Sequence, residues 1–283
     1  MSETQVPVIQ FDVDDGIAVI TVDNPPVNAI SQAVRQGLVD AMKRLADDAE
    51  LEGAVIIGAG KVFIAGADVR EFGKPPMEPF LPAVVAAIEA SEKPVVAAIH
   101  GVALGGGFEI ALGCHFRVMD PKARVGFPEV NLGIIPGAGG TQRLPRLAGV
   151  EKAADLITSG RQVAAKEAME IGLIDVIASD GDLLSAASKL ALSKRKAPLR
   201  RISEMPVPAA NAADFFATEK TKVARAARGQ ESSLRAFEAV EAAATLPFDE
   251  GMKRERAIFQ ELRSSDQAKA LRHVFFAERA VSK

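Results

Sequence analysis

Three observations predict an α/β fold followed by a helical C-terminal region. Short apolar segments that end in glycine or proline alternate with amphipathic segments of helical period along much of the 283-residue chain. From about Asp182 onward, Ala, Glu, Lys and Arg dominate at helical spacing, and the alternation typical of strands is nearly absent. Hydrophobic residues make up 48% of the chain, which is enough for a sizeable core. We therefore expect a strand–turn–helix core in residues 1–200 and a helical region in residues 201–283.

Hydrophobic spacing and breaker residues predict the individual elements. Apolar runs that stop at breakers such as Asn24-Pro25-Pro26 are typical of strands. Strands are expected at residues 16–23, 53–57, 94–99, 115–120, 124–126 and 175–177. Amphipathic spacing predicts helices between them. These are expected at residues 32–50, 80–91, 108–113, 140–147 and 151–159, and in the C-terminal region at about 249–263 and 266–280.

The composition narrows the functional classes. A formal net charge of −3 and a pI near 5.8 argue against a general affinity for nucleic acid. Cys114 is the only cysteine, so neither an intrachain disulfide nor a thiolate metal cluster is expected, and a reducing cytoplasmic location fits best. The start of the chain, Met1 to Gln10, lacks the pattern of a signal peptide. The histidines have no ligand spacing, so we expect packing or surface roles for His100, His115 and His273.

The longest apolar stretch, residues 94–114, is long enough to suggest a membrane span. His100, Glu109 and the many glycines contradict a span, because a carboxylate in hydrocarbon is costly and glycine density suits a tight turn. We expect this stretch to form buried protein core.

Two acidic residues lie beside glycine-rich turns. Glu109 follows Gly105-Gly106-Gly107-Phe108 among apolar neighbours, and Glu129 precedes the apolar turn at residues 134–140. Both carboxyl groups are expected to be buried. A buried carboxylate indicates either catalysis or a bond to backbone amides that anchors the turn, and the stretch around Glu109 leaves both interpretations open.

Backbone amides in two loops complete the predicted chemistry. Small residues at 63–68 allow a ligand to approach the main chain closely. Amides at Ala67 and Gly106 that converge on one carbonyl oxygen would stabilise the negative charge formed when a thioester becomes an enolate. The sequence therefore predicts an enzyme whose backbone amides stabilise an oxyanion such as a thioester enolate.

Three motifs resemble the crotonase family, and specifically enoyl-CoA hydratases. They are AGAD at residues 65–68, GVALGGGFE at 101–109 and FPEVNLGIIPGAGGTQRL at 127–144. The resemblance spans about residues 11–177 and implies a crotonase-like spiral of repeated ββα units with a helical C-terminal region. It also implies that Ala67 and Gly106 supply the oxyanion-hole amides and that Glu109 and Glu129 are the two glutamates of hydratases.

The same resemblance implies further contacts with the acyl-CoA. Gly137 matches the glycine whose amide supports the acyl site. The other positions around the substrate are Asn28, Ala29, Ala65, Gly66, Asp68, Val69 and Gly105. No cofactor is implied, because coenzyme A is part of the substrate.

The implied reaction adds water syn across the double bond of a trans-2-enoyl-CoA, as in fatty acid β-oxidation. Water is held between Glu109 and Glu129, Glu129 being the main acid and base, and the product is a 3-hydroxyacyl-CoA. The acyl chain length depends on a pocket that includes residues 72–82. Two alternatives remain: a Δ3,Δ2-enoyl-CoA isomerase or other acyl-CoA lyase of the same family, and a non-enzymatic RNA-binding or scaffold relative, which the intact glutamates and the acidic pI disfavour.

The C-terminus differs from that of free-standing hydratases, whose terminal helix carries a Phe and a Lys toward CoA. Residues 268–280 instead resemble the linker helix of multifunctional β-oxidation enzymes, between the hydratase/isomerase part and the dehydrogenase part. This implies a functional link to a 3-hydroxyacyl-CoA dehydrogenase. A linker helix folded back on its own core makes a monomer an alternative to the homotrimers and hexamers of free-standing relatives.

Other motifs support no second activity. Gly58-Ala59-Gly60 resembles the start of a dinucleotide fingerprint, but Phe63 stands where its third glycine belongs. The chain has no Tyr and no GxSxG elbow, so neither a catalytic tyrosine nor a serine hydrolase is expected. Arginines near the site are expected to form a basic surface. They are Arg143, Arg146 and Arg161.

Overall fold

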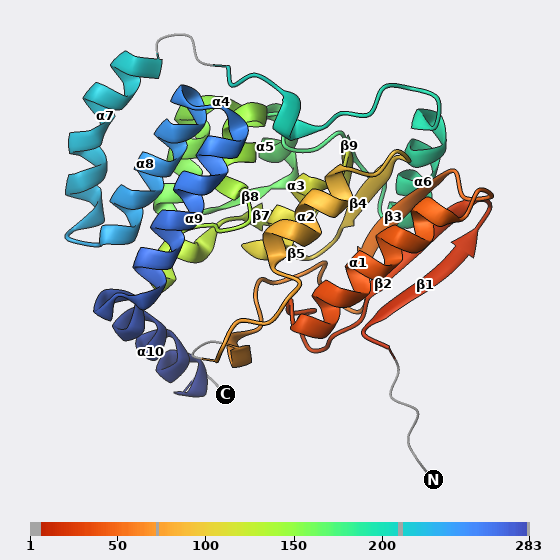
Figure 1. Cartoon of the computed structure of the whole chain (residues 1–283), viewed down its shortest axis with the longest axis horizontal. Coiled ribbons are helices and arrows are strands. Elements are labelled where there is room, and N and C mark those ends of the chain that lie inside the picture. The colour runs from red at the N-terminus through yellow and green to blue at the C-terminus, as the bar shows by residue number, and fades with distance from the viewer. Residues whose placement is uncertain (1–6, 72–73, 209–211, 282–283) are drawn as a thin grey trace. The chain divides into compact units, whose positions relative to one another are not determined.

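The computed structural model describes residues 7–71, 74–208 and 212–281 of the chain (Figure 1). Parts of two predicted segments, residues 1–6 of the N-terminal stretch and 72–73 of the stretch expected to shape the acyl pocket, lie outside these described residues. The contacts divide the chain into two compact units. Unit 1 is Met1–Val125, Ala164–Glu170 and Ile174–Arg201, and unit 2 is Gly126–Val163, Ile171–Leu173 and Ile202–Lys283. The division into domains at residues 200 and 201 stays a prediction.

Unit 1 contains a six-stranded sheet with the strand order β1-β2-β3-β4-β6-β9. Its strands are β1 (Ile9–Asp14), β2 (Ile17–Val22), β3 (Gly53–Gly58), β4 (Val95–Ile99), β6 (Phe116–Met119) and β9 (Val176–Ile177). β1 pairs antiparallel with β2, and all the other neighbours are parallel. The central strands are buried on both faces, as expected for parallel strands covered by helices.

The helices of unit 1 are α1 (Gln32–Asp47), α2 (Leu81–Glu89), α3 (Gly106–Gly113), α5 (Ala165–Glu170) and α6 (Leu183–Lys194), with a 3-10 turn η1 (Val69–Glu71). One row of register partners, Val55, Val96 and Phe116, packs with Ala187 and Ala191 of α6. Side chains alternate between the faces of a sheet, so the neighbouring row, which ends at Arg117, faces away from α6. That face receives α3.

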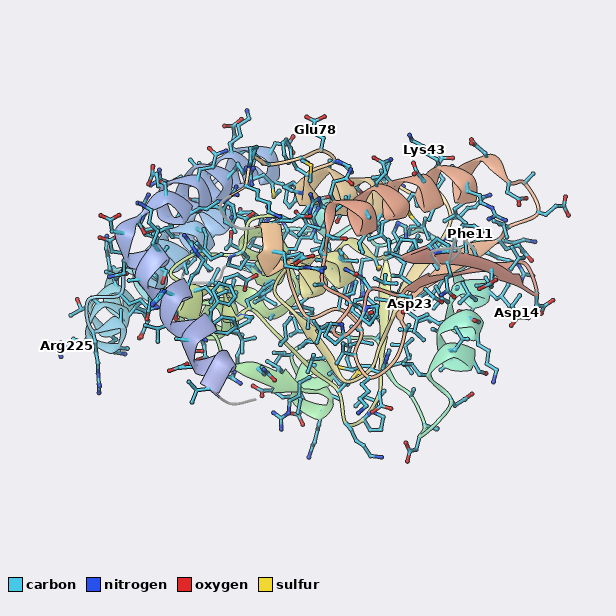
Figure 2. The ribbon with its side chains drawn as sticks, turned by 90° about the horizontal axis from the view of Figure 1, so that it is seen from below. Phe11, Asp14, Asp23, Lys43, Glu78 and Arg225 are labelled. Atoms are coloured by element: carbon cyan, nitrogen blue, oxygen red, sulfur yellow. The ribbon has the colours of Figure 1, made fainter. Side chains whose placement is uncertain are left out.

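The sequence does not predict β1, the edge strand of the sheet. Its outer half, which includes Asp14, is exposed, so the strand carries little of the apolar signal of its neighbours. Figure 2 shows the strand with Phe11 and Asp14 labelled. The guanidinium carbon of Arg44, on α1, lies 4.0 Å from the centre of the Phe11 ring, a cation–π contact that attaches the edge strand to its helix.

Three short strands form a second sheet with the order β5-β7-β8. They are β5 (Val102–Leu104), β7 (Arg124–Gly126) and β8 (Gln162–Ala164). The sequence predicts β7 but not β5 or β8, and all three segments are too short to show a clear period.

Unit 2 is mainly helical. It holds the 3-10 helices η2 (Pro128–Leu132) and η3 (Ile202–Glu204), with α4 (Gly140–Ser159), α7 (Ala212–Ala227), α8 (Glu231–Thr245), α9 (Phe248–Ser264) and α10 (Asp266–Val281). α8 packs along α4, and α7 and α9 both contact α8 (Figure 1). Gly149 interrupts α4 with a φ of 78°, which explains why the sequence predicts two helices there. The helical C-terminal region is confirmed.

The long apolar stretch at residues 94–114 is buried core, as predicted. β4 and α3, which occupy most of it, are buried at every residue. No helix in the described part of the chain has the length and apolar character needed to cross a membrane.

A buried arginine holds the C-terminal end of α3. Arg117 is fully buried, and its Nη1 donates to the carbonyl oxygens of Ala111 at 3.3 Å and Cys114 at 2.8 Å. Burial lowers the pKa of Arg117 to about 10, so the guanidinium stays charged at neutral pH. A cation at the C-terminus of a helix stabilises its exposed carbonyls. Asp175 accepts from the backbone N–H of Arg117 and from the side chain of Arg200, which attaches β9 to the same end.

His115 is a buried packing residue, as the sequence predicts. Its Nδ1 accepts from the N–H of Val95 at 3.0 Å, and its Nε2 lies 3.2 Å from the carbonyl oxygen of Glu89. This pattern requires the neutral imidazole with the proton on Nε2. Burial lowers the pKa of His115 from 6.5 to about 4.

The low pKa of His115 predicts a pH window of instability. An unfolded chain protonates this imidazole below about pH 6.5 and the folded chain only near 4, so stability is lost as the pH falls through that range. The loss from this residue reaches up to about 1.4 kcal/mol per pH unit. The free energy of unfolding in urea, measured between pH 7 and 4, should fall less steeply with pH for His115→Gln than for the wild type. The exposed His273→Gln is the control and should keep the wild-type slope, and equal slopes for all three proteins would contradict the prediction.

Candidate active site

The glycine run at residues 105–107 makes the turn from β5 into α3. Gly105 has a φ of 54°, a left-handed conformation that favours glycine, and it caps the N-terminus of the helix. Gly107 has no room for a side chain, because a methyl group there would lie 2.2 Å from the carbonyl oxygen of Ile64. The N-terminus of α3 therefore lies directly on the segment that leads to Ala67.

Ile30 links the two segments expected to supply amides. It donates its N–H to the Gly66 carbonyl at 2.9 Å and accepts from the N–H of Asp68 at 3.2 Å, so the N–H of Ala67 between them is directed away from Ile30. The side chain of Ile30 reaches the other segment, since a methyl group at Gly106 would lie 2.9 Å from its Cδ1. Gly106 is the first residue of α3, where an N–H has no partner within the helix. Unit 1 thus brings Ala67 and Gly106 together around one side chain.

Glu109 lies in the first turn of α3 and is buried, as predicted, with only 3% of its surface exposed. Its Oε2 lies 4.0 Å from the position that a Cβ of Gly106 would occupy. The carboxyl group is therefore held beside the helix N-terminus, where backbone N–H groups and the helix dipole favour negative charge. One turn of helix supplies both an amide and an acid.

Two polar residues predicted to contact substrate use their side chains within the fold. Asn28, at a left-handed φ of 54°, donates to the carbonyl oxygens of Ala59, Val62 and Phe63 and accepts from the N–H of Asn24. Asp68 is buried and accepts from the backbone and guanidinium of Arg70.

The bond from Arg70 holds the pKa of the Asp68 carboxyl below its usual value. Both side chains therefore fix the loops around Ala29, Ala65 and Gly66. Contact with the substrate stays a prediction for Asn28, Asp68, these neighbours, Gly105 and Val69. Any such contact would come from their backbone groups.

Glu129 and Gly137 belong to unit 2. Glu129 lies in η2 and is half-buried as a residue, but Oε2 of its carboxylate is buried, so the predicted burial holds for that oxygen. Its carbonyl oxygen accepts from the N–H of Ile134 at 3.2 Å, and Gly133 ends η2 at a left-handed φ of 74°. Gly137 has no room for a side chain, because a methyl group there would lie 2.7 Å from the ring of Phe259 on α9. The proximity of Glu109 to Glu129 stays a prediction.

The predicted basic surface is wrong for two of its three arginines. Arg143 and Arg146 are buried in unit 2, and each guanidinium carbon lies 5.0 Å from the centre of the Phe248 ring. Nη1 of Arg146 also donates to the Gln142 carbonyl at 2.6 Å. Only Arg161 reaches the surface, where it pairs with Asp155 at 2.7 Å. The Phe248 ring that packs on the other two belongs to α9, far along the chain.

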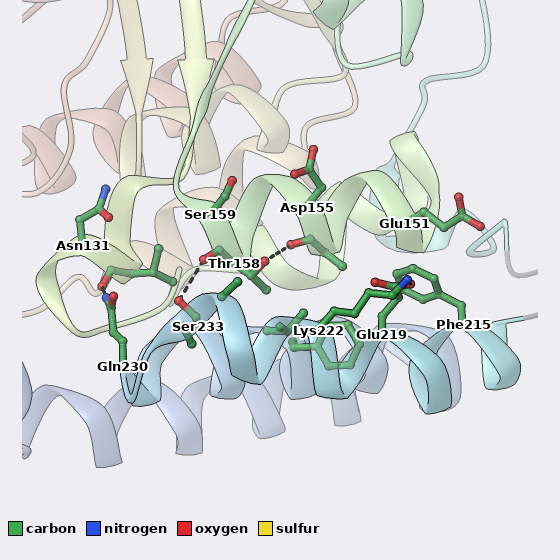
Figure 3. Close-up of a pocket in the computed structure, with 16 residues that line it drawn as sticks. Asn131, Glu151, Asp155, Thr158, Ser159, Phe215, Glu219, Lys222, Gln230 and Ser233 are labelled. Carbon is green, nitrogen blue, oxygen red and sulfur yellow. Dashed lines mark hydrogen bonds and ion pairs between the residues drawn. The ribbon is translucent and has the colours of Figure 1, made fainter.

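A cavity of about 480 Å³ lies elsewhere in unit 2, between α4, α7 and α8 (Figure 3). Phe215 and Phe237 line its apolar part, and Glu219 and Lys222 form an ion pair of 2.5 Å beside them. None of the predicted site residues lines it, although Val130 and Asn131, the neighbours of Glu129, do. Among the described residues, no group of His, Cys, Asp and Glu side chains has the arrangement of a metal site.

Together, these features define a class of protein: an α/β fold with repeated strand–turn–helix units, in which a glycine turn carries a buried glutamate at a helix N-terminus. Residues 12–205 match the family described as enoyl-CoA hydratase/isomerase. The chain therefore belongs to the enoyl-CoA hydratase/isomerase family, and its fold is the α/β crotonase fold with a helical C-terminal region.

Curated relatives are similar to nearly the whole chain. The peroxisomal bifunctional enzyme of Danio rerio is 48% identical over 270 residues, which cover 94% of this chain and 37% of that protein. The peroxisomal fatty acid beta-oxidation multifunctional protein of Oryza sativa subsp. japonica is 35% identical, over 95% of this chain and 39% of its own. The chain thus spans less than two fifths of the length of these relatives.

Solved structures share the fold over most of the chain. An enoyl-CoA hydratase from Bacillus anthracis has a TM-score of 0.62 and 29% identity, and the match covers 92% of both chains. An enoyl-CoA hydratase/isomerase from Pseudoalteromonas atlantica has a TM-score of 0.73 over 96% of this chain and 97% of its own. At 23% identity, that second likeness concerns the fold alone.

The close approach at Gly107 predicts a severe effect of one methyl group. Gly107→Ala should lower the free energy of unfolding by about 3 kcal/mol, because the clash is with backbone and no side chain can move aside. Urea denaturation measures the change. Gly60→Asn is the control: Gly60 has open space around it, and Asn tolerates its left-handed φ of 72°. A Gly107→Ala variant as stable as the control would contradict the packing described for α3.

Proposed function

We propose that the chain is a 2-enoyl-CoA hydratase that works through a thioester enolate. The observation that carries the proposal is the first turn of α3, where the amide of Gly106 and the carboxyl group of Glu109 lie side by side. The amide of Ala67, held next to it by Ile30, supplies the second donor. Membership of the enoyl-CoA hydratase/isomerase family supports the substrate class.

In the proposed reaction, the amides of Ala67 and Gly106 hold the thioester oxygen. The oxygen of a water molecule attacks the β-carbon, and the electrons of the double bond move toward the thioester to give the enolate. The amides stabilise this charge, and removal of one such donor typically costs about 10²–10³ in rate. Glu129 takes the proton from water and returns one to the α-carbon, while Glu109 orients the water. The proposal requires both carboxylates to meet on one water molecule.

The N-terminus of α3 has two roles in the proposed reaction. Backbone N–H groups of α3 face the developing oxyanion and, with the helix dipole, hold Glu109 beside it. The buried position excludes bulk water from the carboxyl group, so that only the bound water reacts. A 3-hydroxyacyl-CoA is the product, which an NAD-linked dehydrogenase of the kind expected as partner can oxidise.

The setting of this activity is also a proposal. The names of the two curated relatives cited place those proteins in peroxisomes and link the second to fatty acid beta-oxidation. For this chain we propose a role in the same pathway and a reducing compartment, cytoplasmic or peroxisomal. Burial raises the pKa of the Cys114 thiol to about 12, which keeps it protonated and unreactive.

Two substitutions test the proposed roles of the glutamates. Glu129→Gln should lower kcat for hydration of crotonyl-CoA by about 10²–10⁴, the usual contribution of a general acid–base group. Glu109→Gln should also lower kcat, because the Gln amide has one acceptor oxygen for the water where the carboxylate has two. The loss of enoyl-thioester absorbance measures the rate. Glu92→Gln, an exposed glutamate of unit 1, should match the wild type.

Each alternative has its own outcome in this experiment. Full hydration activity of Glu109→Gln would overturn the two-glutamate hydratase. Conversion of a 3-enoyl-CoA that survives in Glu109→Gln but not in Glu129→Gln would establish the isomerase instead. If the wild type acts on no 2-enoyl-CoA of any chain length and shifts RNA in a salt-sensitive manner, the enzyme proposal is replaced by the RNA-binding alternative.

A further inference from the structure

α9 carries a glutamate on its buried face. Gly251, Glu255, Ile258 and Leu262 are the buried residues of this helix, and their spacing of three and four positions places them on one stripe. Glu255 has 0% of its surface exposed. A carboxylate in a buried apolar stripe is costly unless donors compensate it. Its partners therefore indicate what it does.

Those partners are the N-terminal residues of α4. One carboxylate oxygen of Glu255 accepts from the N–H of Gly139 at 2.7 Å, and the other accepts from the N–H and the hydroxyl of Thr141 at 2.9 and 2.6 Å. Gly139 is the N-cap of α4, at a left-handed φ of 101°, and has no side chain to cap the helix itself. Glu255 thus supplies, from more than 100 residues away, the cap that α4 lacks.

The same face of α9 lies against the turn that precedes α4. Phe259, one helical turn beyond Glu255, packs directly on Gly137. Met252, nearly one turn before it, has its sulfur 3.1 Å from where a Cβ of Gly139 would be. Residues 137–139, in the second half of the turn, therefore pack against α9. α9 lies beside α4 (Figure 1).

The turn also connects back to Glu129. Its first residue, Ile134, donates its N–H to the Glu129 carbonyl at 3.2 Å. Gly139 and Gly137 are thus connected through the turn to the backbone of η2. The hydrogen bonds at Glu255 fix the far end of this segment.

We propose that Glu255 is a positioning residue for the reaction, whose buried carboxylate sets the turn at residues 134–140 in its active conformation. The inference rests on the proposed hydratase function, because it assigns the turn its purpose: to place the Gly137 amide and the Glu129 carboxyl group. Glu255 itself does not touch the substrate. Its effect is on geometry, and a misplacement of about 1 Å is enough to cost about 10²-fold in rate.

Glu255→Gln tests this role with little change in volume. The amide keeps an acceptor for Gly139 but turns an NH₂ group toward the N–H of Thr141, so two donors face each other. We expect kcat for crotonyl-CoA hydration to fall at least about tenfold. KM should change by a smaller factor than kcat, because all the expected contacts with the acyl-CoA except the Gly137 amide lie in unit 1, which the substitution does not touch. A purely structural role would lower the melting temperature but leave kcat per folded molecule unchanged.

Glu250→Gln is the matched control on the same helix. Its side chain is 54% exposed and pairs with Lys253, so kcat and KM should equal those of the wild type. Circular dichroism at the assay temperature confirms that each variant is folded. If Glu255→Gln does not fold, Thr141→Val replaces it: this variant loses the hydroxyl donor alone and should lower kcat in the same direction by a smaller factor.

The outcomes separate the inference from the function on which it rests. A wild type without activity on any 2-enoyl-CoA would remove the proposed function. An active wild type with a folded Glu255→Gln, or in its place a folded Thr141→Val, whose kcat is within twofold of the wild-type value would overturn the positioning role alone.

Discussion

The contact of α3 with the main chain at Ile64 is the constraint on which the rest of unit 1 depends. It exists only because Gly107 has no side chain, and the helix that makes it is buried along its whole length. At the other end, Arg117 satisfies carbonyls that a buried helix terminus would leave exposed. Held at both ends, α3 presents the Gly106 amide and the Glu109 carboxyl group in one fixed turn, next to the loop that carries Ala67.

Unit 2 reaches a comparable rigidity by a different route. Three of the seven residues in its turn at 134–140 are glycines, and α9 packs against them with Phe259 and the carboxylate of Glu255. The C-terminal helices are therefore more than a cover for the core. They supply contacts that a glycine-rich turn cannot make for itself. Because the turn has no side chains at its glycines, a ligand can approach its backbone closely.

Local patterns in the sequence predict the buried strands, α3 and the C-terminal helices, because each has a period or a breaker that can be recognised within a short window. β1, β5 and β8 have neither, being exposed at an edge or only three residues long. Arg143, Arg146 and Glu255 escape prediction for another reason: each is buried in contacts between the α4 region and α9, across more than 100 residues. The stripe from Gly251 to Leu262 does mark Glu255 as unusual, since the carboxylate occupies an apolar position of an otherwise amphipathic helix.

In the proposed reaction, an enolate stabilised at Ala67 and Gly106 forms and is then protonated at the α-carbon. The most direct measurement is to let the purified chain convert crotonyl-CoA in D₂O and to analyse the product by mass spectrometry and NMR. We expect 3-hydroxybutyryl-CoA with a single solvent deuteron at the α-carbon in one stereochemical position. No hydrated product, or a product without deuterium at the α-carbon, would contradict it.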